Sequence, residues 1–471
     1  MIAGLKPYTE YRDSGLPWLG QVPAHWEVRR IKSVLREVDR RSAAGREPLL
    51  SLRMQAGLVD HHASGGRPIP PSALVGYKRV LPGEIVMNRM RASAGLFAAA
   101  TTDGLVSPDY AIFRSVGSAN VAYLVELFRT PALRAIFRLE STGLGTGESG
   151  FLRLYSDQFG RLTIPMPPTA EQTAIVRFLD WANGRLERAI RAKRKVIALL
   201  TEQKQAIVRQ AITHGLDPTV ALKPSGFPWI GPIPKHWEVL ALKRVLKRLI
   251  DCEHKTAPLV DESPYRVIRT TAVRKGALQS RGTYCTSAAA FHAWTRRGQP
   301  EAGDVIFTRE APAGEACIVP EGVSVCLGQR TVLMKPNKQR LNSQLLVYLI
   351  YAGPPRVSIT LATQGSTVGH FNMSDIGALM ILLPPRSEQD DIVSAIEERT
   401  SGLDQTISRL EREIELIREY RARFVADVVT GKLNVRDAAA RLPEDVTASR
   451  DVEPTDESED PELIDEEATE A

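Results

Sequence analysis

The chain has 471 residues, too many for one hydrophobic core, and ordinary domain sizes predict about three folded units. Hydrophobic residues make up 43%, enough for packed cores, but the longest apolar run, Ile376 to Leu383, is far shorter than the roughly 18 to 20 residues that span a bilayer. The first residues also lack the apolar stretch of a signal peptide. These features predict a cytoplasmic protein with no membrane partner.

The net charge of +6 is unevenly distributed along the chain. Residues 444–471 contain thirteen Asp and Glu and one Arg, a net charge of −12, so residues 1–443 carry +18. The composition of the tail predicts a disordered acidic segment. The basic remainder suggests a polyanionic partner, nucleic acid first, although excess charge can also serve solubility alone.

Cysteine and histidine give no sign of a metal site. The four cysteines (252, 285, 317 and 326) contain no C-x-x-C pair, which indicates free thiols of a cytosolic protein and not a disulfide or zinc framework. The pair His61-His62 has no Cys or acidic partner at ligand spacing. We therefore predict no metal ligands.

One short stretch occurs twice. PWLGQVPAHWEVRRIKSVL, Pro17 to Leu35, returns as PWIGPIPKHWEVLALKRVL, Pro228 to Leu246, with 11 of 19 positions identical. Chance would give about one match, so the chain contains an internal repeat. His25 and His236 within it have no nucleophile at a shared spacing, and its tryptophans are typical of packing anchors, so we interpret the motif as structural.

The repeat continues downstream. PGEIVMNR (Pro82 to Arg89) and AGDVIFTR (Ala302 to Arg309) predict equivalent strands, each entered from a Pro/Gly or Ala/Gly turn. A further strand follows in each copy, and a [DQ]-x-x-[VI] pattern matches Asp109 with Gln329 there. The intervening segments, residues 40–160 and 251–375, otherwise differ. This pattern predicts a duplicated scaffold that carries two unlike inserts.

Each copy ends in a long predicted helix that follows a proline-rich stop, with Glu-Gln pairs in LTIPMPPTAEQ and ILLPPRSEQ. Apolar residues recur along both helices at alternating steps of four and three, a seven-residue repeat typical of a helix that packs on a partner helix. The predicted contact residues are Leu186, Ile190, Ile197, Leu200, Ile207, Leu403, Ile407, Leu410, Ile414, Ile417 and Phe424. Each helix has one obvious partner, the helix of the other copy.

Motifs of catalysis are missing. The chain contains neither G-x-x-x-x-G-K-[ST] nor H-E-x-x-H, and none of its Pro-Pro pairs fits the signature of amino-methyltransferases. GLGTG, Gly143 to Gly147, has glycine spacing seen in cofactor loops, but a predicted helix precedes it where such loops need a strand. We predict no catalytic residues and no cofactor in this chain.

The joint pattern resembles the specificity subunit of Type I restriction-modification systems. The resemblance rests on the G-x-P-x-H-W-E-V opening of each half, on GDVIFTR with LGQRTVLM, and on the two helix starts, and it covers residues 11 to 434. It implies an α/β (α+β) fold: two target-recognition domains joined by two long antiparallel coiled-coil helices with pseudo-twofold symmetry. The acidic tail lies outside the resemblance.

The same resemblance implies the partners. They are double-stranded DNA, two N6-adenine methyltransferase subunits on the helices, and two ATP-dependent translocase-nuclease subunits, with S-adenosylmethionine, ATP and Mg²⁺ in those partners. The expected segments are an N-terminal arm (1–16), a first target-recognition domain (17–168), a central helix (169–216), a second target-recognition domain (217–385), a C-terminal helix (386–434) and an acidic disordered tail (435–471).

Side-chain chemistry selects candidates for DNA contact, because Arg and Lys hold phosphates while Arg, Asn and Gln read base edges. The candidates are Lys78, Arg79, Asn88, Arg89, Arg91, Arg266, Arg269, Arg309, Arg330 and Gln364. Arg89, Arg309 and Arg330 occupy positions assigned to the shared scaffold, which favours a structural role for them. Two alternatives remain open for the whole chain: a fused DNA-modifying or DNA-cleaving enzyme, and a coiled-coil scaffold protein without DNA specificity.

Overall fold

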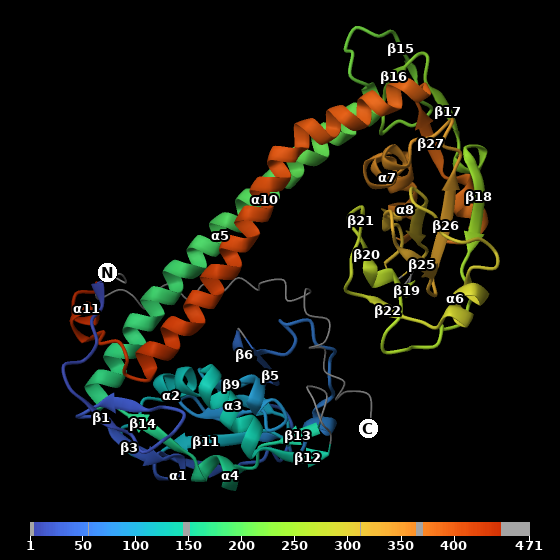
Figure 1. Cartoon of the computed structure of the whole chain (residues 1–471). Helices are drawn as coiled ribbons and strands as arrows, with labels where there is room; N and C mark the ends of the chain where they lie inside the picture. The colour runs from blue at the N-terminus through green and yellow to red at the C-terminus, as the bar shows by residue number, and fades with distance from the viewer. Residues whose placement is uncertain (1–3, 55, 145–150, 311, 364–370, 444–471) are drawn as a thin grey trace. The chain divides into compact units, whose positions relative to one another are not determined.

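The computed structural model describes residues 4–54, 56–144, 151–310, 312–363 and 371–443 (Figure 1). The chain divides into two compact units, a first unit from residues 1–193 and 412–471 and a second unit from residues 194–411. Two long helices, α5 (Thr169–His214) and α10 (Arg386–Val429), each contribute to both units. Gln364 and the acidic segment 444–471 lie outside the described residues.

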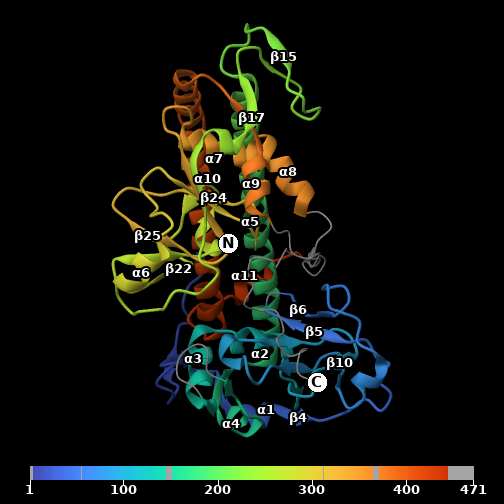
Figure 2. The same ribbon diagram turned by 90° about the vertical axis from the view of Figure 1, so that its right-hand side faces the viewer.

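The two long helices lie side by side and run antiparallel (Figures 1 and 2). Ion pairs join Glu187 to Arg421 at 3.4 Å and Lys193 to Glu413 at 2.5 Å within the first unit. Lys204 and Asp404 form a third pair at 2.6 Å within the second unit. Residue numbers rise along α5 as they fall along α10, so the direction of pairing follows directly from these contacts.

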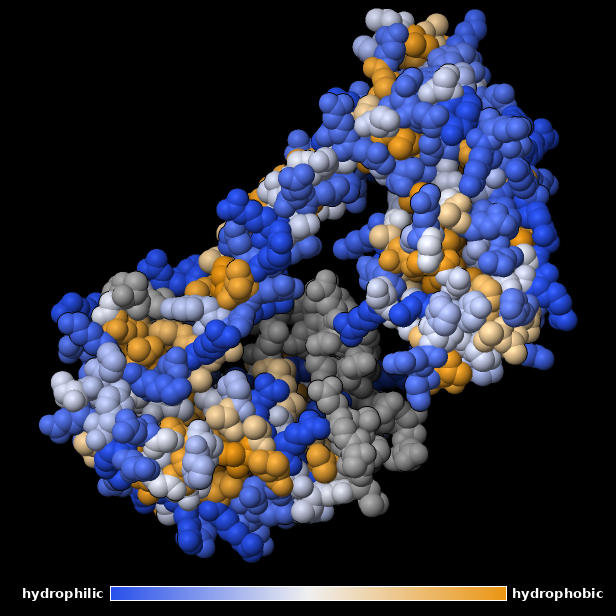
Figure 3. Space-filling model, in the orientation of Figure 1, coloured by the Kyte–Doolittle hydropathy of each residue, from blue (hydrophilic) through white to orange (hydrophobic). Residues whose placement is uncertain are grey.

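The apolar stripe predicted on each helix is the protected face of that helix. All eleven stripe residues are buried or half-buried, and most residues between them are exposed. Ile190, Ile414 and Phe424 are the most protected, each less than 7% exposed. The outward face is largely hydrophilic along the part of the helices visible in Figure 3, although it also carries exposed apolar residues such as Leu199 and Leu416.

A four-stranded antiparallel sheet in strand order β4-β11-β8-β9 forms the centre of the first unit. Its strands are β4 (Leu35–Val38), β8 (Ile85–Met87), β9 (Phe97–Ala99) and β11 (Ala111–Ser115). Helices pack on one of its faces, α1 (Ile31–Val34), α2 (Val121–Phe128), α3 (Pro131–Glu140) and α4 (Ser156–Arg161). Phe97, Phe128, Phe137 and Phe159 fill the core between these helices and the sheet.

The second unit repeats this arrangement with the strand order β18-β26-β23-β24. Its strands are β18 (Leu246–Asp251), β23 (Val305–Thr308), β24 (Ala316–Ile318) and β26 (Thr331–Pro336). The equivalent helices are α7 (Ser343–Ala352), α8 (Pro354–Thr363) and α9 (Met373–Ala378). A short 3-10 helix, η4 (Leu242–Arg244), takes the place of α1, so the scaffold is duplicated element by element.

Short hairpins and two-stranded sheets complete the shared part. They are β1 (Tyr11–Asp13) with β2 (Gln21–Pro23), β3 (Glu27–Arg30) with β14 (Thr163–Met166), β15 (Leu222–Pro224) with β16 (Pro232–Pro234), and β17 (Glu238–Ala241) with β27 (Met380–Leu383). In each unit the strand of the opening motif thus pairs with the strand that leads into a long helix. This pairing brings the start and the end of each repeat together.

The inserts differ in structure as they do in sequence. The first unit has β5 (Leu50–Arg53), β6 (Gly57–Asp60), β7 (Lys78–Val80), β10 (Gly104–Val106), β12 (Thr142–Leu144) and β13 (Phe151–Arg153). The second has β19 (Tyr265–Ile268), β20 (Val273–Arg274), β21 (Ala277–Leu278), β22 (Thr283–Cys285), α6 (Ala288–Trp294) and β25 (Ser324–Leu327). One difference is topological, since β19 pairs in parallel with β25, whereas the named strand pairs of the first unit are all antiparallel.

Strand pairing corrects the match of Asp109 with Gln329 that the sequence suggested. Ile112 pairs with Val86 in the first unit, and Leu333 pairs with Ile306, the equivalent of Val86, in the second. Counting back three residues from each makes Arg330, and not Gln329, the counterpart of Asp109. The matched pattern was wrong by one residue because it kept the offset of 220 residues between Pro82 and Ala302, whereas the segment that joins the paired strands is one residue longer in the second unit.

The repeated opening motif fastens the start of a long helix in each unit. In the first unit Glu171, in the first turn of α5, accepts hydrogen bonds from Tyr8 Oη at 2.5 Å and Trp26 Nε1 at 3.1 Å, and its other oxygen lies 2.8 Å from His25 Nε2. In the second unit Glu388 of α10 lies 2.7 Å from His236 Nε2 and 3.0 Å from Trp237 Nε1. The two histidines are thus bound to structural carboxylates.

The same tryptophans contact the end of the other long helix. A Cβ on Gly431, after the end of α10, would lie 2.4 Å from Pro23 Cδ and 3.1 Å from the ring of Trp26. Gly215, after the end of α5, would place its Cβ 3.4 Å from the ring of Trp237. Both glycines have positive φ, +81° and +76°, a conformation that suits glycine. Each opening motif therefore joins the two helices of its unit.

Residues 435–443, which the sequence assigned to the acidic tail, belong to the folded first unit. They include the short helix α11 (Arg436–Ala440), and Val435, Ala439 and Leu442 are buried in the main core. Arg177 of α5 donates hydrogen bonds to the carbonyls of Leu442 and Pro443, both at 2.8 Å. Five of the nine residues of this segment are apolar, but the segment is short and directly precedes the charged residues, so the sequence did not separate it from them.

Replacing Glu171 by alanine removes the acceptor of Tyr8, His25 and Trp26. Buried donors left without a partner cost roughly 1–3 kcal/mol, so we expect a lower urea midpoint for the variant, measured by tryptophan fluorescence. Glu388→Ala should cost less, because the side chain of Glu388 is 27% exposed and that of Glu171 only 4%, so water can replace more of the lost contacts. Glu411→Ala, at an exposed position of α10, is the control. A midpoint for Glu171→Ala equal to that of the control would contradict this assignment.

The four cysteines are free thiols, and all lie in the second unit. Burial raises the pKa of Cys317 and of Cys326 to about 12, and it also raises the pKa of Cys252. Only thiolates react readily with alkylating reagents. The half-buried Cys285 is therefore the most accessible thiol of the four.

We expect iodoacetamide at pH 8 to modify Cys285 in the folded chain and to modify Cys317 and Cys326 only after unfolding. Mass spectrometry of tryptic peptides measures this order, and the urea-unfolded chain is the control in which all four thiols react. Labelling of Cys317 as fast as Cys285 in the folded chain would show that the core of the second unit opens readily.

Candidate nucleic-acid interface

Two of the predicted contacts lie on strand β7, where side chains alternate between inside and outside. Lys78 points inward: it is 3% exposed, its ammonium donates to the carbonyl of Tyr110 at 2.7 Å, and burial lowers its pKa. Arg79 points outward and pairs with Asp103, whose pKa is lowered chiefly by that hydrogen bond. Of the two, Arg79 is the residue that DNA can reach.

Three further candidates follow β8. Asn88 is buried, and its Oδ1 accepts from the backbone of Met90 at 2.9 Å and of Arg91 at 3.2 Å, so it shapes the turn. Arg89 donates to Glu37 at 2.7 Å. Arg91 is exposed. This turn therefore presents one arginine outward and uses its two neighbours internally.

In the second unit, Arg266 and Arg269 lie on or beside β19 and are exposed. Arg266 Nη1 lies 3.3 Å from Thr283 Oγ1. The guanidinium of Arg269 lies over the ring of Tyr284, 4.7 Å from its centroid. A stacked guanidinium keeps its in-plane donors available, which suits contact with phosphate or a base edge.

Arg309 and Arg330 meet at one end of the central sheet of the second unit. Arg309 is 7% exposed and donates to both oxygens of Asp251 at 2.8 Å, so it links the end of β23 to the end of β18 across the intervening strand β26. Arg330 is exposed and pairs with Glu310 at 2.8 Å. Together with His254 and Gln329 they line a small hollow of about 120 Å³.

The predicted residues thus separate into two groups. Lys78, Asn88, Arg89 and Arg309 make contacts inside their units, which disfavours direct contact with DNA. Arg79, Arg91, Arg266, Arg269 and Arg330 are at least partly exposed and include the cations available to a polyanion. Gln364 lies outside the described residues. Sequence could not make this distinction because strand alternation and ion pairing depend on partners far along the chain.

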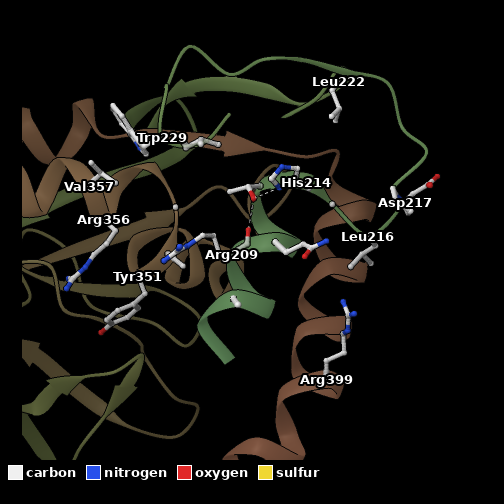
Figure 4. A pocket seen from close by; sticks show the side chains of 18 residues that line it. Arg209, His214, Leu216, Asp217, Leu222, Trp229, Tyr351, Arg356, Val357 and Arg399 are labelled. Carbon is white, nitrogen blue, oxygen red and sulfur yellow. Dashed lines mark hydrogen bonds between the residues drawn. The ribbon is translucent and has the colours of Figure 1, made fainter. Parts of the chain in front are cut away.

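A larger hollow of about 880 Å³ lies in the second unit and was not anticipated from the sequence (Figure 4). Arg209 of α5, Arg356 of α8 and Arg399 of α10 line it, with Trp229 and Tyr351. Arginine and aromatic side chains are enriched at protein interfaces. The three arginines come from elements far apart in the chain, so no local pattern in the sequence could have revealed them.

Within the part of the chain that the structure describes, no group of three or more His, Cys, Asp or Glu is arranged to hold a metal ion. No helix found in those same residues is both long enough and apolar enough to cross a membrane. The loop GLGTG, which has the glycine spacing of cofactor loops, extends beyond the described residues after Leu144.

Comparison with known proteins gives consistent relatives. A family model described as the Type I restriction modification DNA specificity domain matches residues 298–416. A Methanocaldococcus jannaschii protein named as the MjaX type I restriction enzyme specificity subunit is 22% identical over 438 residues, which cover 89% of this chain and 96% of that protein.

One solved structure shares the fold, and a second aligns less well. A chain from a study of complex assembly and conformational transition of the type I restriction-modification system aligns with a TM-score of 0.59 and 15% identity over 88% of this chain and 99% of its own. The HsdS subunit from Thermoanaerobacter tengcongensis aligns with a TM-score of 0.40 and 17% identity over 88% and 98%.

The duplicated sheets, the two long helices, the matching family model and the full-length relative agree with one another. Over most of its length the chain is similar to a specificity subunit of a type I restriction enzyme, and residues 298–416 match the Type I restriction modification DNA specificity domain.

Proposed function

We propose that each unit reads one half of a split site in double-stranded DNA, and that the long helices set the distance between the halves. The observation that carries this proposal is the duplicated scaffold with unlike inserts. Equivalent sheets, β4-β11-β8-β9 and β18-β26-β23-β24, hold segments that differ in sequence and in topology. Two equivalent scaffolds that carry different inserts suit a DNA site whose two halves have different sequences.

Exposed arginines supply the contacts with DNA. Arg79 and Arg91 serve the first half-site, and Arg266, Arg269 and Arg330 serve the second. Guanidinium groups bind phosphates and also donate to guanine, so the same residue type both positions the duplex and reads it. With a net charge of +18 outside the acidic segment, binding should weaken steeply as the salt concentration rises.

Catalysis belongs to the partners. We propose that two adenine methyltransferase subunits dock on the long helices and that two ATP-dependent translocase-nuclease subunits join the full complex. These subunits would bind S-adenosylmethionine, ATP and Mg²⁺, and this chain would select the DNA sequence on which they act.

Sequencing of modified bases in the source genome tests the proposed function. The wild-type genome should contain one split motif methylated on both strands, and deletion of the gene for this chain should abolish that methylation. Reintroduction of the gene is the control that should restore it. Methylation that persists at every motif after deletion would refute the assignment.

The helices can be tested as a spacer by shortening both together. Removal of residues 194–200 from α5 and 411–417 from α10 takes one seven-residue repeat from each stripe and preserves the opposed positions of Glu187 with Arg421 and of Lys204 with Asp404. Seven residues correspond to about 10 Å of helix, so the nonspecific spacer should shorten by up to about three base pairs while both half-sites persist.

The spacer length is read from the methylated motif of cells that carry the shortened chain. Deletion from α5 alone is the matched control, because it shifts one stripe against the other and should abolish methylation. An unchanged spacer in the doubly shortened chain would contradict the role of the helices as a spacer.

A further inference from the structure

The turn that leads into the second strand of each central sheet places opposite charges at the same structural position. Strand pairing makes Asp109, two residues before β11, the counterpart of Arg330, the residue before β26. Both side chains are exposed. The two units therefore differ at a point where their scaffolds coincide.

The equivalence of Asp109 and Arg330 is supported by the direction in which the residues after them face. Ile112 and Leu333 face the smaller core of their unit, whereas Phe113 and Met334 face the main core. A shift of one residue would exchange these faces. The neighbouring strand agrees once the one-residue irregularity between Leu246 and Arg248 in β18 is allowed for, because Ile112 then pairs with Val38 as Leu333 pairs with Ile250.

Each of the two side chains is held by an opposite charge. Asp109 lies 3.6 Å from Arg153, and Arg330 lies 2.8 Å from Glu310. These ion pairs are partly exposed, so a DNA base can replace the protein partner at little cost. The ion pairs thus hold both charged side chains in place at the surface.

The backbone at Arg330 is strained. Its φ is +68°, in the left-handed region that residues other than glycine seldom adopt. The carbonyl of Arg330 accepts from the amide of Arg309 at 2.9 Å, and Thr331 Oγ1 donates to the carbonyl of Gly328 at 2.7 Å, so the turn is fixed on both sides. Strained residues that the surroundings hold in place cluster at functional sites.

The two side chains have complementary hydrogen-bonding chemistry. A carboxylate accepts only, and in the major groove it suits the exocyclic amine of cytosine; a guanidinium donates only, and it suits O6 and N7 of guanine. We propose that Asp109 and Arg330 are equivalent base-reading residues, with Asp109 selecting an amino-bearing base in one half-site and Arg330 selecting guanine in the other. This proposal rests on the proposed function of the two units.

The test replaces the chromosomal gene with variants and sequences the modified bases of the source genome. Arg330→Gly is the sharpest variant, because glycine accepts a positive φ and removes the guanidinium. We expect the fold to be kept and the preference for guanine at one position of one half-site to fall by at least about tenfold, while the other half-site stays unchanged.

Asp109→Asn gives an independent test in the first unit. Asparagine has nearly the same shape but can both donate to and accept from adenine, so the preference at one position of the first half-site should move toward adenine. Arg114→Ala, at an exposed position on the same strand β11, is the matched control and should leave the motif unchanged.

An unaltered motif in Arg330→Gly and Asp109→Asn cells that still methylate would overturn the inference and leave the proposed function intact. Loss of both half-sites together, with a thermal midpoint equal to wild type for the purified variant chain, would also overturn it. Absence of any split motif in wild-type cells would instead overturn the proposed function itself.

Discussion

The carboxylate in the first turn of each long helix is the contact on which the duplicated architecture depends. Glu171 and Glu388 each bind the histidine and the tryptophan of an opening motif, and each indole ring lies near the glycine that follows the other helix. One motif thus ties two helices together within its unit. This requirement explains why the sequence repeats the motif and why its His and Trp are engaged in structure.

In each unit the paired helix segments owe their stability to the apolar stripe and their register to ion pairs. Apolar stripe residues supply the buried surface, whereas Lys204 and Arg421, which occupy equivalent stripe positions, reach acidic residues on the partner helix. Surface ion pairs contribute little free energy of folding. A polar residue within an apolar stripe nevertheless disfavours other registers, so these pairs specify alignment more than they stabilise.

In each unit the shared scaffold makes the internal contacts, and the insert carries exposed arginines that we propose contact DNA. Residues common to both units are buried in cores or engaged in internal pairs, as Arg89 is with Glu37 and Arg309 with Asp251. Exposed arginines such as Arg91 and Arg269 lie where the two halves differ. Because the scaffold provides its own core, the inserts can change without a large loss of folding free energy, as the proposed independent reading by the two units requires.

Local patterns in the sequence determined much of the architecture. The repeat, the long helices and their apolar stripes all depend on residues near one another in the chain, whose spacing reflects helical or strand geometry directly. The helices α5 and α10 begin at Thr169 and Arg386, at the proline-rich stops that predicted them.

Only the tertiary structure decided which charges face solvent. Lys78 and Arg79 are adjacent in sequence, yet one is buried against Tyr110 and the other exposed beside Asp103. The equivalence of Asp109 and Arg330 needed cross-strand pairing, because the segments that join β8 to β11 and β23 to β26 differ in length by one residue. Such outcomes depend on partners brought together by folding from distant parts of the chain, which periodicity and composition do not encode.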